Sequence, residues 1–297
     1  MSTMSKVLAK LDADESRAPE PVAAEDVLAA GLADSSAEGL GDNADGSQFV
    51  PDPSRPLDMR PPVLGTPSFD VNGETRAWDA ARIDPVITLF HQRYAPISEQ
   101  YRGVRARLLA TNASQAAQAI VVTSAVPGEG KTAATINLGL ALAEGGEHRV
   151  LIADADFRRT SVARMLGAED RPGLADVLRG EATLGQALQP TPLPNLKLLP
   201  AGTVSAQDFS ELLGGTNVAT TLDDLRLGFH YVLLDTPPVT TVSDVSLLAP
   251  NCDGALVVVW MRRTPEPLVQ QAIRTLQANN VKVLGCLLSR FHERGAN

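Results

Sequence analysis

The chain has 297 residues, 44% of them apolar, which suffices for one core of about 200 residues with some additional segments. Its formal net charge of −9 arises in residues 1–80, which hold 15 acidic and 6 basic side chains. Residues 81–297 hold 20 of each, so the body of the protein is neutral and we expect no nucleic-acid partner.

The cysteines and the distribution of apolar residues indicate the cellular compartment. Cys252 and Cys286 lie far apart without a CxxC spacing, which suits free thiols in a reducing compartment. The first residues lack the apolar stretch of a secretory signal, and no apolar run approaches the ~18 residues of a membrane span. We therefore expect a cytoplasmic protein without a direct membrane span.

Residues 1–80 form the first predicted region. This acidic segment is rich in Asp, Ser, Gly and Pro and poor in large apolar side chains. It cannot bury enough surface to offset the entropy of ordering, so we expect it to be disordered. A single α/β domain is expected over residues 81–297.

The first helix of that domain is predicted over residues 96–111, with Pro96 in its first turn and Ser98 as its N-cap. Short apolar runs then alternate with amphipathic segments. Strands are predicted at 119–125, 149–156, 195–202, 231–235, 254–261 and 282–291. Helices are predicted at 131–146, 160–167, 205–215, before the strand at 231, and at 266–280. This alternation predicts a mostly parallel sheet with helices on both faces.

The stretch "AVPGEGKT" lies between the first strand and the following helix, which is the context of a phosphate-binding loop. Glycines there allow backbone N–H groups to face phosphate oxygens, and the helix N-terminus adds positive partial charge. Lys131 is expected to reach the β- and γ-phosphates, and the hydroxyl of Thr132 to bind Mg²⁺. The residues expected to contact the nucleotide are Pro127, Gly128, Glu129, Gly130, Lys131, Thr132 and Ala133.

Three aspartates end two of the predicted strands, Asp154 and Asp156 on one and Asp235 on the other. Ligands of open α/β sheets bind at the carboxyl ends of the strands, so these carboxylates should lie near the loop. We expect Thr132, Asp156 and Asp235 to hold Mg²⁺, and Asp154 or Asp156 to act as the base. Arg158 either stabilises phosphate charge or ties down the carboxylates, and a surface salt bridge is its alternative role.

Residues 83–290 resemble the cytoplasmic ATPase domain of bacterial tyrosine kinases of the capsule and exopolysaccharide type. The stretches that carry the resemblance are "AVPGEGKT", "LIADADFR", "VLLDTPPV" and "EQYRGVR". The resemblance implies a P-loop NTPase fold, the use of ATP and Mg²⁺, and phosphoryl transfer to tyrosine. It also implies a separate membrane polysaccharide co-polymerase as partner, which would bring the protein to the inner membrane.

The motif "EQYRGVR" places Glu99, Arg102 and Arg105 three residues apart, near one face of a helix. In the kinases that the chain resembles, this motif builds a ring-like homo-oligomer, which the resemblance implies here as well. The alternative is a solvated charged face with ion pairs inside the helix.

Two features distinguish this chain from relatives in the same superfamily. Partition and septum-positioning ATPases carry a lysine five residues before the loop lysine, where this chain has Val126. The kinases that the chain resembles usually end in clustered tyrosines, whereas this sequence ends "LLSRFHERGAN". Tyr231 is expected in the core and Tyr101 in packing or an interface, which leaves Tyr94 as the most accessible acceptor.

Base recognition is the least defined part of the site. An asparagine that often follows the last strand in those relatives corresponds to Ser289 here, and Arg290 is expected to contribute to nucleotide binding instead.

Four functional hypotheses follow. We favour an ATP-dependent tyrosine kinase that regulates exopolysaccharide or capsule synthesis. The alternatives are an ATPase switch that controls a membrane polysaccharide co-polymerase, a partition-type positioning ATPase, and a nucleotide-binding scaffold without turnover.

Overall fold

The computed structural model describes residues 67–71, 75–112, 114–170, 172–205, 208–241 and 244–290. The predictions for residues 1–66 lie outside the described residues. Phe69 and Val71, from the predicted N-terminal segment, are buried, and the ring of Phe69 stacks on Phe229 with centroids 5.9 Å apart. We expected residues 1–80 to be disordered, but Phe69 and Val71 belong to the packed core, because their apolar side chains cover the sheet.

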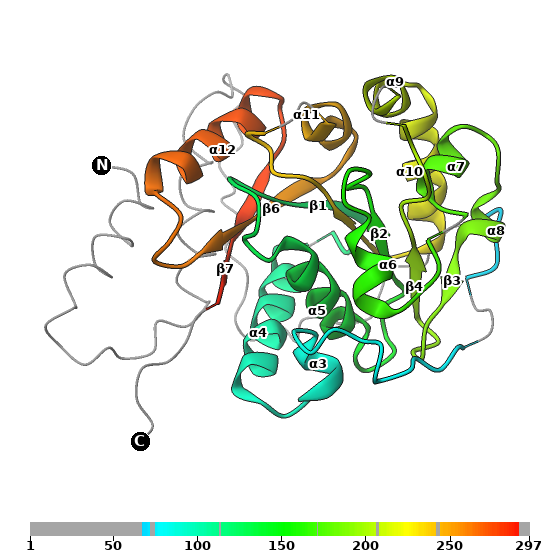
Figure 1. The fold of residues 1–297 in the computed structure, drawn as a ribbon, viewed down its shortest axis with the longest axis horizontal. Helices are drawn as coiled ribbons and strands as arrows, with labels where there is room; N and C mark the ends of the chain where they lie inside the picture. The colour runs from blue at the N-terminus through cyan, green and yellow to red at the C-terminus, as the bar shows by residue number, and fades with distance from the viewer. Residues whose placement is uncertain are drawn as a thin grey trace, which may run out of the picture.

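A seven-stranded sheet forms the centre of the molecule, in the order β3-β4-β2-β5-β1-β6-β7 (Figure 1). All neighbouring strands are parallel except β3 and β4, which confirms the mostly parallel α/β fold. The strands are β1 (Gln118–Ser124), β2 (Val150–Asp154), β3 (Gln189–Pro190), β4 (Leu196–Leu199), β5 (Tyr231–Asp235), β6 (Gly254–Trp260) and β7 (Val283–Ser289).

Helices cover both faces of the sheet (Figure 1). The first face carries α3 (Thr88–His91), α4 (Pro96–Thr111), α5 (Lys131–Ala143) and α6 (Ser161–Leu166). The second carries α7 (Leu174–Leu178), α8 (Leu184–Ala187), α9 (Phe209–Gly214), α10 (Asn217–Gly228), α11 (Asp244–Leu248), a 3₁₀ turn (Ala249–Asn251) and α12 (Glu266–Ala278). None of the helices in the described part of the chain is both long and apolar enough to cross a bilayer.

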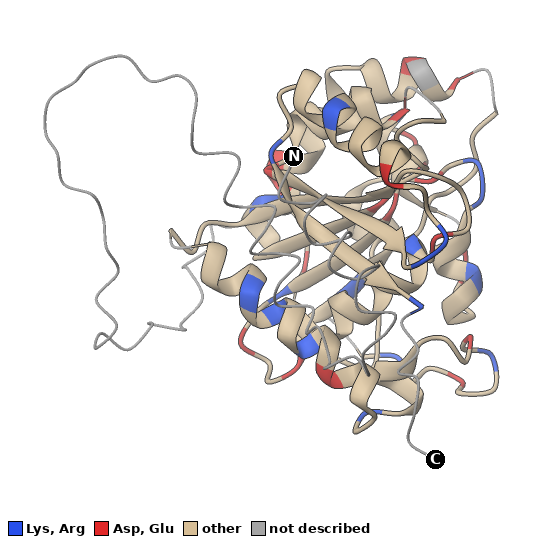
Figure 2. Ribbon diagram, turned by 90° about the vertical axis from the view of Figure 1, so that its left-hand side faces the viewer, with Lys and Arg blue, Asp and Glu red and all other residues tan. Residues whose placement is uncertain are grey.

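Successive side chains of a strand point to opposite faces of the sheet, so each strand contributes to the apolar core on either face. In β1, Ile120 and Val122 pack with the α3–α6 side, whereas Ala119 and Val121 pack with the α7–α12 side. Both faces are buried, which explains why the strands read as continuous apolar runs. Charged residues lie mostly on the helices and loops around the sheet (Figure 2).

One predicted helix cap is wrong. The N-cap of α4 is Ala95, with Pro96 in the first turn, and the hydroxyl of Ser98 donates to the carbonyl of Gln92 at 2.8 Å. Proline suits the first helical position because its missing N–H would have no helical acceptor there. Ser98 therefore ties the helix to the preceding turn.

The sheet order brings the predicted site residues together. Strand β5 lies between β1 and β2, and Asp154 stands opposite Asp235 in the parallel register. The loop after β1 and the acidic ends of β2 and β5 consequently share one edge of the sheet.

Candidate nucleotide-binding site

The loop between β1 and α5 has the backbone of a phosphate cradle. Gly128 and Gly130 have φ values of 87° and 86°, in the left-handed region that glycine tolerates best. Helix α5 begins immediately after Gly130, at Lys131, so its first N–H groups have no earlier helical carbonyls as acceptors. Such a helix start is a favourable place for a phosphate group.

The side chain of Glu129 fixes this loop in place. It is 1% exposed, and its carboxylate accepts hydrogen bonds from the backbone N–H groups of Val126 at 2.9 Å and Trp260 at 3.2 Å. The hydroxyl of Thr264 donates to the same carboxylate. The backbone carbonyl of Glu129 accepts from the hydroxyl of Ser289 at 2.6 Å. The loop is thereby fastened to the ends of β6 and β7.

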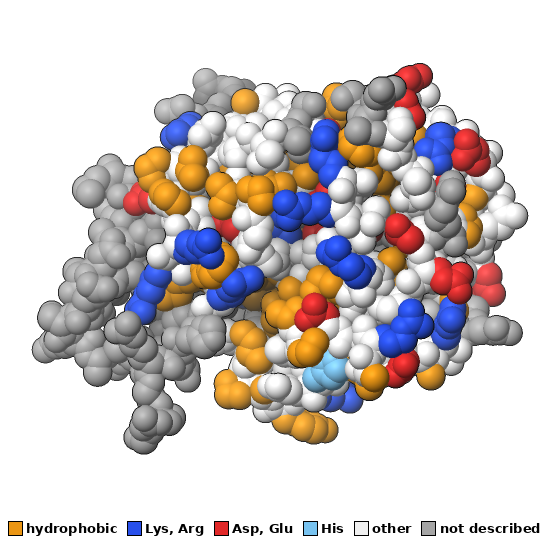
Figure 3. Space-filling model, in the orientation of Figure 1, with side chains coloured by type: hydrophobic (Ala, Val, Ile, Leu, Met, Phe, Trp, Pro, Cys, Tyr) orange, Lys and Arg blue, Asp and Glu red, His pale blue; other side chains and the backbone are white. Residues whose placement is uncertain are grey.

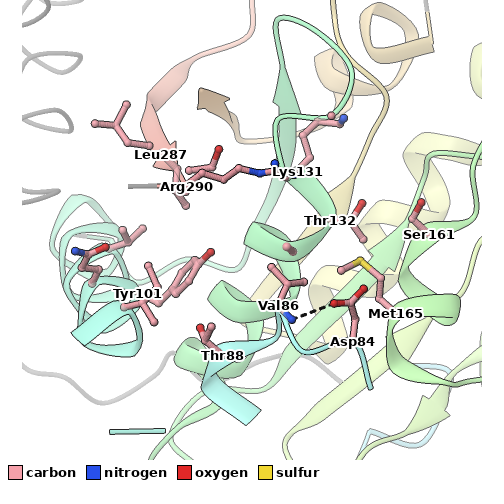
Figure 4. A pocket seen from close by; sticks show the side chains of 18 of the residues that line it. Asp84, Val86, Thr88, Tyr101, Lys131, Thr132, Ser161, Met165, Leu287 and Arg290 are labelled. Carbon is pink, nitrogen blue, oxygen red and sulfur yellow. Dashed lines mark hydrogen bonds between the residues drawn. The ribbon is translucent and has the colours of Figure 1, made fainter. Parts of the chain in front are cut away.

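A cavity of about 800 Å³ opens beside the loop (Figure 4). Figure 3 shows basic side chains around a hollow on this face, and Arg159, Arg164 and Arg290 belong to the lining. From the loop and α5 come Gly128, Gly130, Lys131, Thr132 and Ala133. The opposite wall is more apolar and includes Ile97, Tyr101 and Val104 of α4 with Cys286, Leu287 and Leu288 of β7.

Lys131 is 8% exposed at the bottom of this arrangement. Burial lowers the pKa of its ammonium group, while the carboxylates of Asp235 and Asp156 oppose that shift. A buried cation flanked by carboxylates can neutralise phosphate oxygens that enter the cavity.

The three aspartates have different surroundings. Both carboxylate oxygens of Asp154 accept backbone N–H groups, from Asp156 at 3.0 Å and Val162 at 2.9 Å. Asp235 accepts the hydroxyl of Thr132 at 2.6 Å. Asp156 lines the cavity, and its buried Oδ1 has no hydrogen-bond partner among the described residues.

Burial raises the pKa of each of these carboxyl groups, because charge is costly away from water. The negative charge of Asp235 raises the pKa of Asp154 further. Such a cluster of buried carboxyl groups gains from a cation.

The donor set fits Mg²⁺. A hydroxyl and carboxylates are the hard oxygen ligands that this ion prefers, and Thr132 and Asp156 both belong to the cavity lining. Within the described ranges, no cluster of three or more His, Cys, Asp or Glu side chains could hold a metal by itself. Mg²⁺ usually keeps several waters and is bound through one or two carboxylates together with substrate phosphates.

Arg158 lies away from the cavity lining. Its guanidinium donates two hydrogen bonds to Asp244, at 2.8 and 3.1 Å, and its Cζ lies 4.7 Å from the ring centroid of Phe209. Arg159, which the sequence analysis did not single out, lines the cavity instead. The two adjacent arginines in "DADFRRT" could have indicated that either one reaches the cavity. The sequence alone does not show which of the two does.

Of the remaining residues predicted to contact the nucleotide, one lies in the cavity lining and one does not. Pro127 is exposed in the loop but is not part of the cavity lining, whereas Arg290 is part of it. The guanidinium carbon of Arg290 lies 3.8 Å from the ring centroid of Trp260, and that of Arg263 lies 4.1 Å from it. Arginine stacking thus holds Arg290 at the edge of the cavity.

Two residues of the predicted interface motif, Arg102 and Arg105, meet Glu144 just after α5. Arg102 donates to Glu144 at 2.6 and 2.8 Å and also to Glu99, and Arg105 donates to the carbonyl of Ala141 at 2.9 Å. The hydrogen bond from Arg102 lowers the pKa of Glu144. The motif therefore already ties α4 to the far end of the loop helix within one chain.

Comparisons with known proteins agree with this geometry. Residues 115–289 match the ParA family model, described as NUBPL iron-transfer P-loop NTPase. The chain is 33% identical over 195 residues to the succinoglycan biosynthesis transport protein ExoP of Rhizobium meliloti, covering 65% of this chain and 25% of that protein. It spans about a quarter of the length of the longer curated relatives that it matches.

A shorter relative is covered more completely. The chain is 31% identical over 173 residues to the tyrosine-protein kinase CpsD of Streptococcus pneumoniae, covering 58% of this chain and 75% of that protein. Among solved structures, the BceF tyrosine kinase domain is similar with a TM-score of 0.60 and 29% identity. That similarity covers 72% of this chain and 82% of the BceF domain.

Proposed function

The chain belongs to the bacterial tyrosine kinase family of P-loop proteins, and from this premise we propose that it transfers the γ-phosphoryl group of ATP to a tyrosine hydroxyl. The observation that carries the proposal is that buried Lys131 and Asp156 line the same cavity beside the loop, with the charge of each influencing the pKa of the other. A phosphate-neutralising cation and a free proton acceptor are the two groups that this transfer needs.

In the proposed mechanism, the loop backbone and Lys131 hold the phosphates of ATP. Asp156, which lines the cavity, orients the attacking hydroxyl and accepts its proton. Asp154 acts as a positioning residue, because its carboxylate holds the backbone N–H of Asp156 at 3.0 Å. Most of the acceleration comes from this positioning and from charge neutralisation.

Thr132 and Asp235 would hold Mg²⁺, with Asp156 as a further candidate ligand. The ion would neutralise the charge on the phosphates during transfer. Arg159 and Arg290, which line the cavity, would contact the nucleotide or the acceptor, whereas Arg158 supports the site through Asp244.

We also propose a cellular setting. The name of ExoP places it in succinoglycan biosynthesis transport, which supports a role in regulating exopolysaccharide or capsule synthesis. A separate membrane polysaccharide co-polymerase would be the partner, and it would hold the protein at the inner membrane. The exposed side of the Glu99, Arg102 and Arg105 motif would contribute to a homo-oligomer.

The test uses the full chain with γ-labelled ATP, Mg²⁺ and a tyrosine-containing polymer. Lys131→Met should abolish labelling of the polymer, since the phosphate-neutralising cation is lost. Lys282→Met is the matched control, because Lys282 is exposed at the opposite end of β7 from the cavity. Wild-type ATP consumption by Lys131→Met would contradict the site assignment.

A further inference from the structure

The cavity beside the loop has two ends of different chemistry (Figure 4). Tyr101 of α4 and Leu287 of β7 lie at one end, among largely apolar side chains. The other end, which we call the α6 end of the cavity, lies on the side of Thr132. Its lining consists of Asp84, Val86, Thr88, Ser161, Arg164 and Met165. Binding of the phosphates at the loop leaves this second end without an assigned ligand.

One wall of the α6 end is held firmly by its neighbours. The backbone N–H of Asp84 donates to the carbonyl of Met165 on α6 at 2.9 Å, and the carboxylate of Asp84 accepts the N–H of Val86 at 3.0 Å. Asn137 of α5, which is 1% exposed, accepts the N–H of Leu89 at 3.0 Å and donates to the carbonyl of Val86 at 3.2 Å. Because both α5 and α6 hold this wall, a ligand meets a preformed surface and orders little backbone on binding.

Two arginines give the α6 end positive charge. Arg164 is exposed, and its guanidinium donates to the hydroxyl of Ser161 at 3.1 Å. Arg159 is also exposed and lines the same cavity, and its charge opposes the rise that burial causes in the pKa of Asp156. Asp84 is the acidic group in this part of the lining, apart from Asp156 itself. A carboxylate that enters here can therefore receive charge-assisted hydrogen bonds from arginine.

Val86 adds an exposed apolar side chain to this end. It lines the cavity and is 46% exposed, whereas its neighbour Ile87 is fully buried. The triphosphate of a nucleotide has no apolar surface to bury against Val86. The ring of a tyrosine has such a surface, and its burial is favourable.

The geometry of transfer assigns the acceptor to this end. The attacking oxygen approaches the γ-phosphorus from the side opposite the β,γ-bridging oxygen. Asp156 is the proposed base, and the backbone N–H of Arg159 donates to its carbonyl at 3.0 Å, in the turn between β2 and α6. A tyrosine hydroxyl that meets Asp156 consequently brings the residues beside that tyrosine close to Arg159 and α6.

We propose that the α6 end of the cavity binds the acceptor peptide, and that Arg164, together with Arg159, selects tyrosines flanked by Asp or Glu. This inference rests on the proposed kinase function and names the class of its acceptor. The planar guanidinium of Arg164 donates hydrogen bonds to the flanking carboxylate, and Val86 packs against the tyrosine ring. The two arginines also offset the repulsion between that carboxylate and the triphosphate.

The test gives the full chain ATP, Mg²⁺ and one of three synthetic peptides, in which a single tyrosine is flanked on both sides by Glu, Gln or Lys. Wild type should phosphorylate the Glu peptide with a kcat/KM about tenfold above that of the Gln peptide. Arg164→Gln should bring the two values together through a higher KM for the Glu peptide. Arg164→Glu should favour the Lys peptide, and Arg164→Lys, which keeps the charge, should retain a preference for Glu. The matched control is Arg274→Gln, an exposed arginine on α12, which should behave like wild type.

The KM for ATP, measured in parallel, shows that each variant is folded. Equal kcat/KM values of wild type for the Glu and Gln peptides would overturn the inference and leave the kinase function standing. A full preference for Glu in Arg164→Gln, with an unchanged KM for ATP, would likewise remove Arg164 as the selecting residue. If ATP is consumed but neither the peptides nor a tyrosine-containing polymer is phosphorylated, the kinase function is overturned together with the inference.

Discussion

Removing the carboxylate of Glu129 should damage both the stability of the protein and its affinity for ATP. In Glu129→Ala, the partly buried N–H groups of Val126 and Trp260 lose their acceptor. Each such group costs about 1–3 kcal/mol when it is left unsatisfied. Water entering the vacated space would relieve part of this cost, so we expect a loss of about 3 kcal/mol in the free energy of unfolding.

For a domain of this size, that loss lowers the melting temperature by about 6–12 °C. The loop is no longer fastened to β6, so ATP affinity should fall about tenfold or more, which is about 1.4 kcal/mol. Thermal unfolding followed by circular dichroism and ATP titration measure the two effects. Glu181→Ala is the control, since Glu181 is 57% exposed and pairs with Arg179 only at the surface.

The control should lose less than about 1 kcal/mol. If Glu129→Ala has the same melting temperature as the control and binds ATP like wild type, the anchoring role of this side chain is wrong.

Three further predictions test other parts of the account. Arg102→Ala with Arg105→Ala should give a smaller species in light scattering, and an unchanged mass would refute the oligomer role. Asp156→Asn should reduce turnover about 10²–10⁴-fold while nucleotide binding persists, and an unaltered kcat would exclude it as the base. Burial lowers the pKa of His148, so the unfolded chain binds more protons below pH ~6.5 and stability should fall as the pH drops. His148→Gln should flatten that fall between pH 7 and 5.5 in urea titrations, and an unchanged pH dependence would contradict it.

Local patterns were enough to predict much of the fold. A few neighbouring residues suffice to recognise the apolar runs, the loop "GEGKT" and the aspartates at the strand ends. The short elements β3, α7 and α8 were missed because two to five residues carry no readable period. Phe69 and Val71 were missed because their burial depends on a surface built by distant strands.

Long-range contacts explain what the sequence could not specify about the site. Glu129 is anchored by Trp260 and Thr264, more than a hundred residues later, so its sequence neighbours do not reveal that role. The separation of Arg158 from the cavity depends likewise on Asp244.

The most direct measurement of the central claim is the fate of the γ-phosphoryl group. Full-length protein is incubated with γ-labelled ATP, Mg²⁺ and the tyrosine-containing polymer, and phosphotyrosine and inorganic phosphate are quantified for wild type and Lys131→Met. A tyrosine kinase yields phosphotyrosine that disappears in the variant. Release of inorganic phosphate alone, at the full rate of ATP consumption, would contradict the kinase function and indicate an ATPase switch.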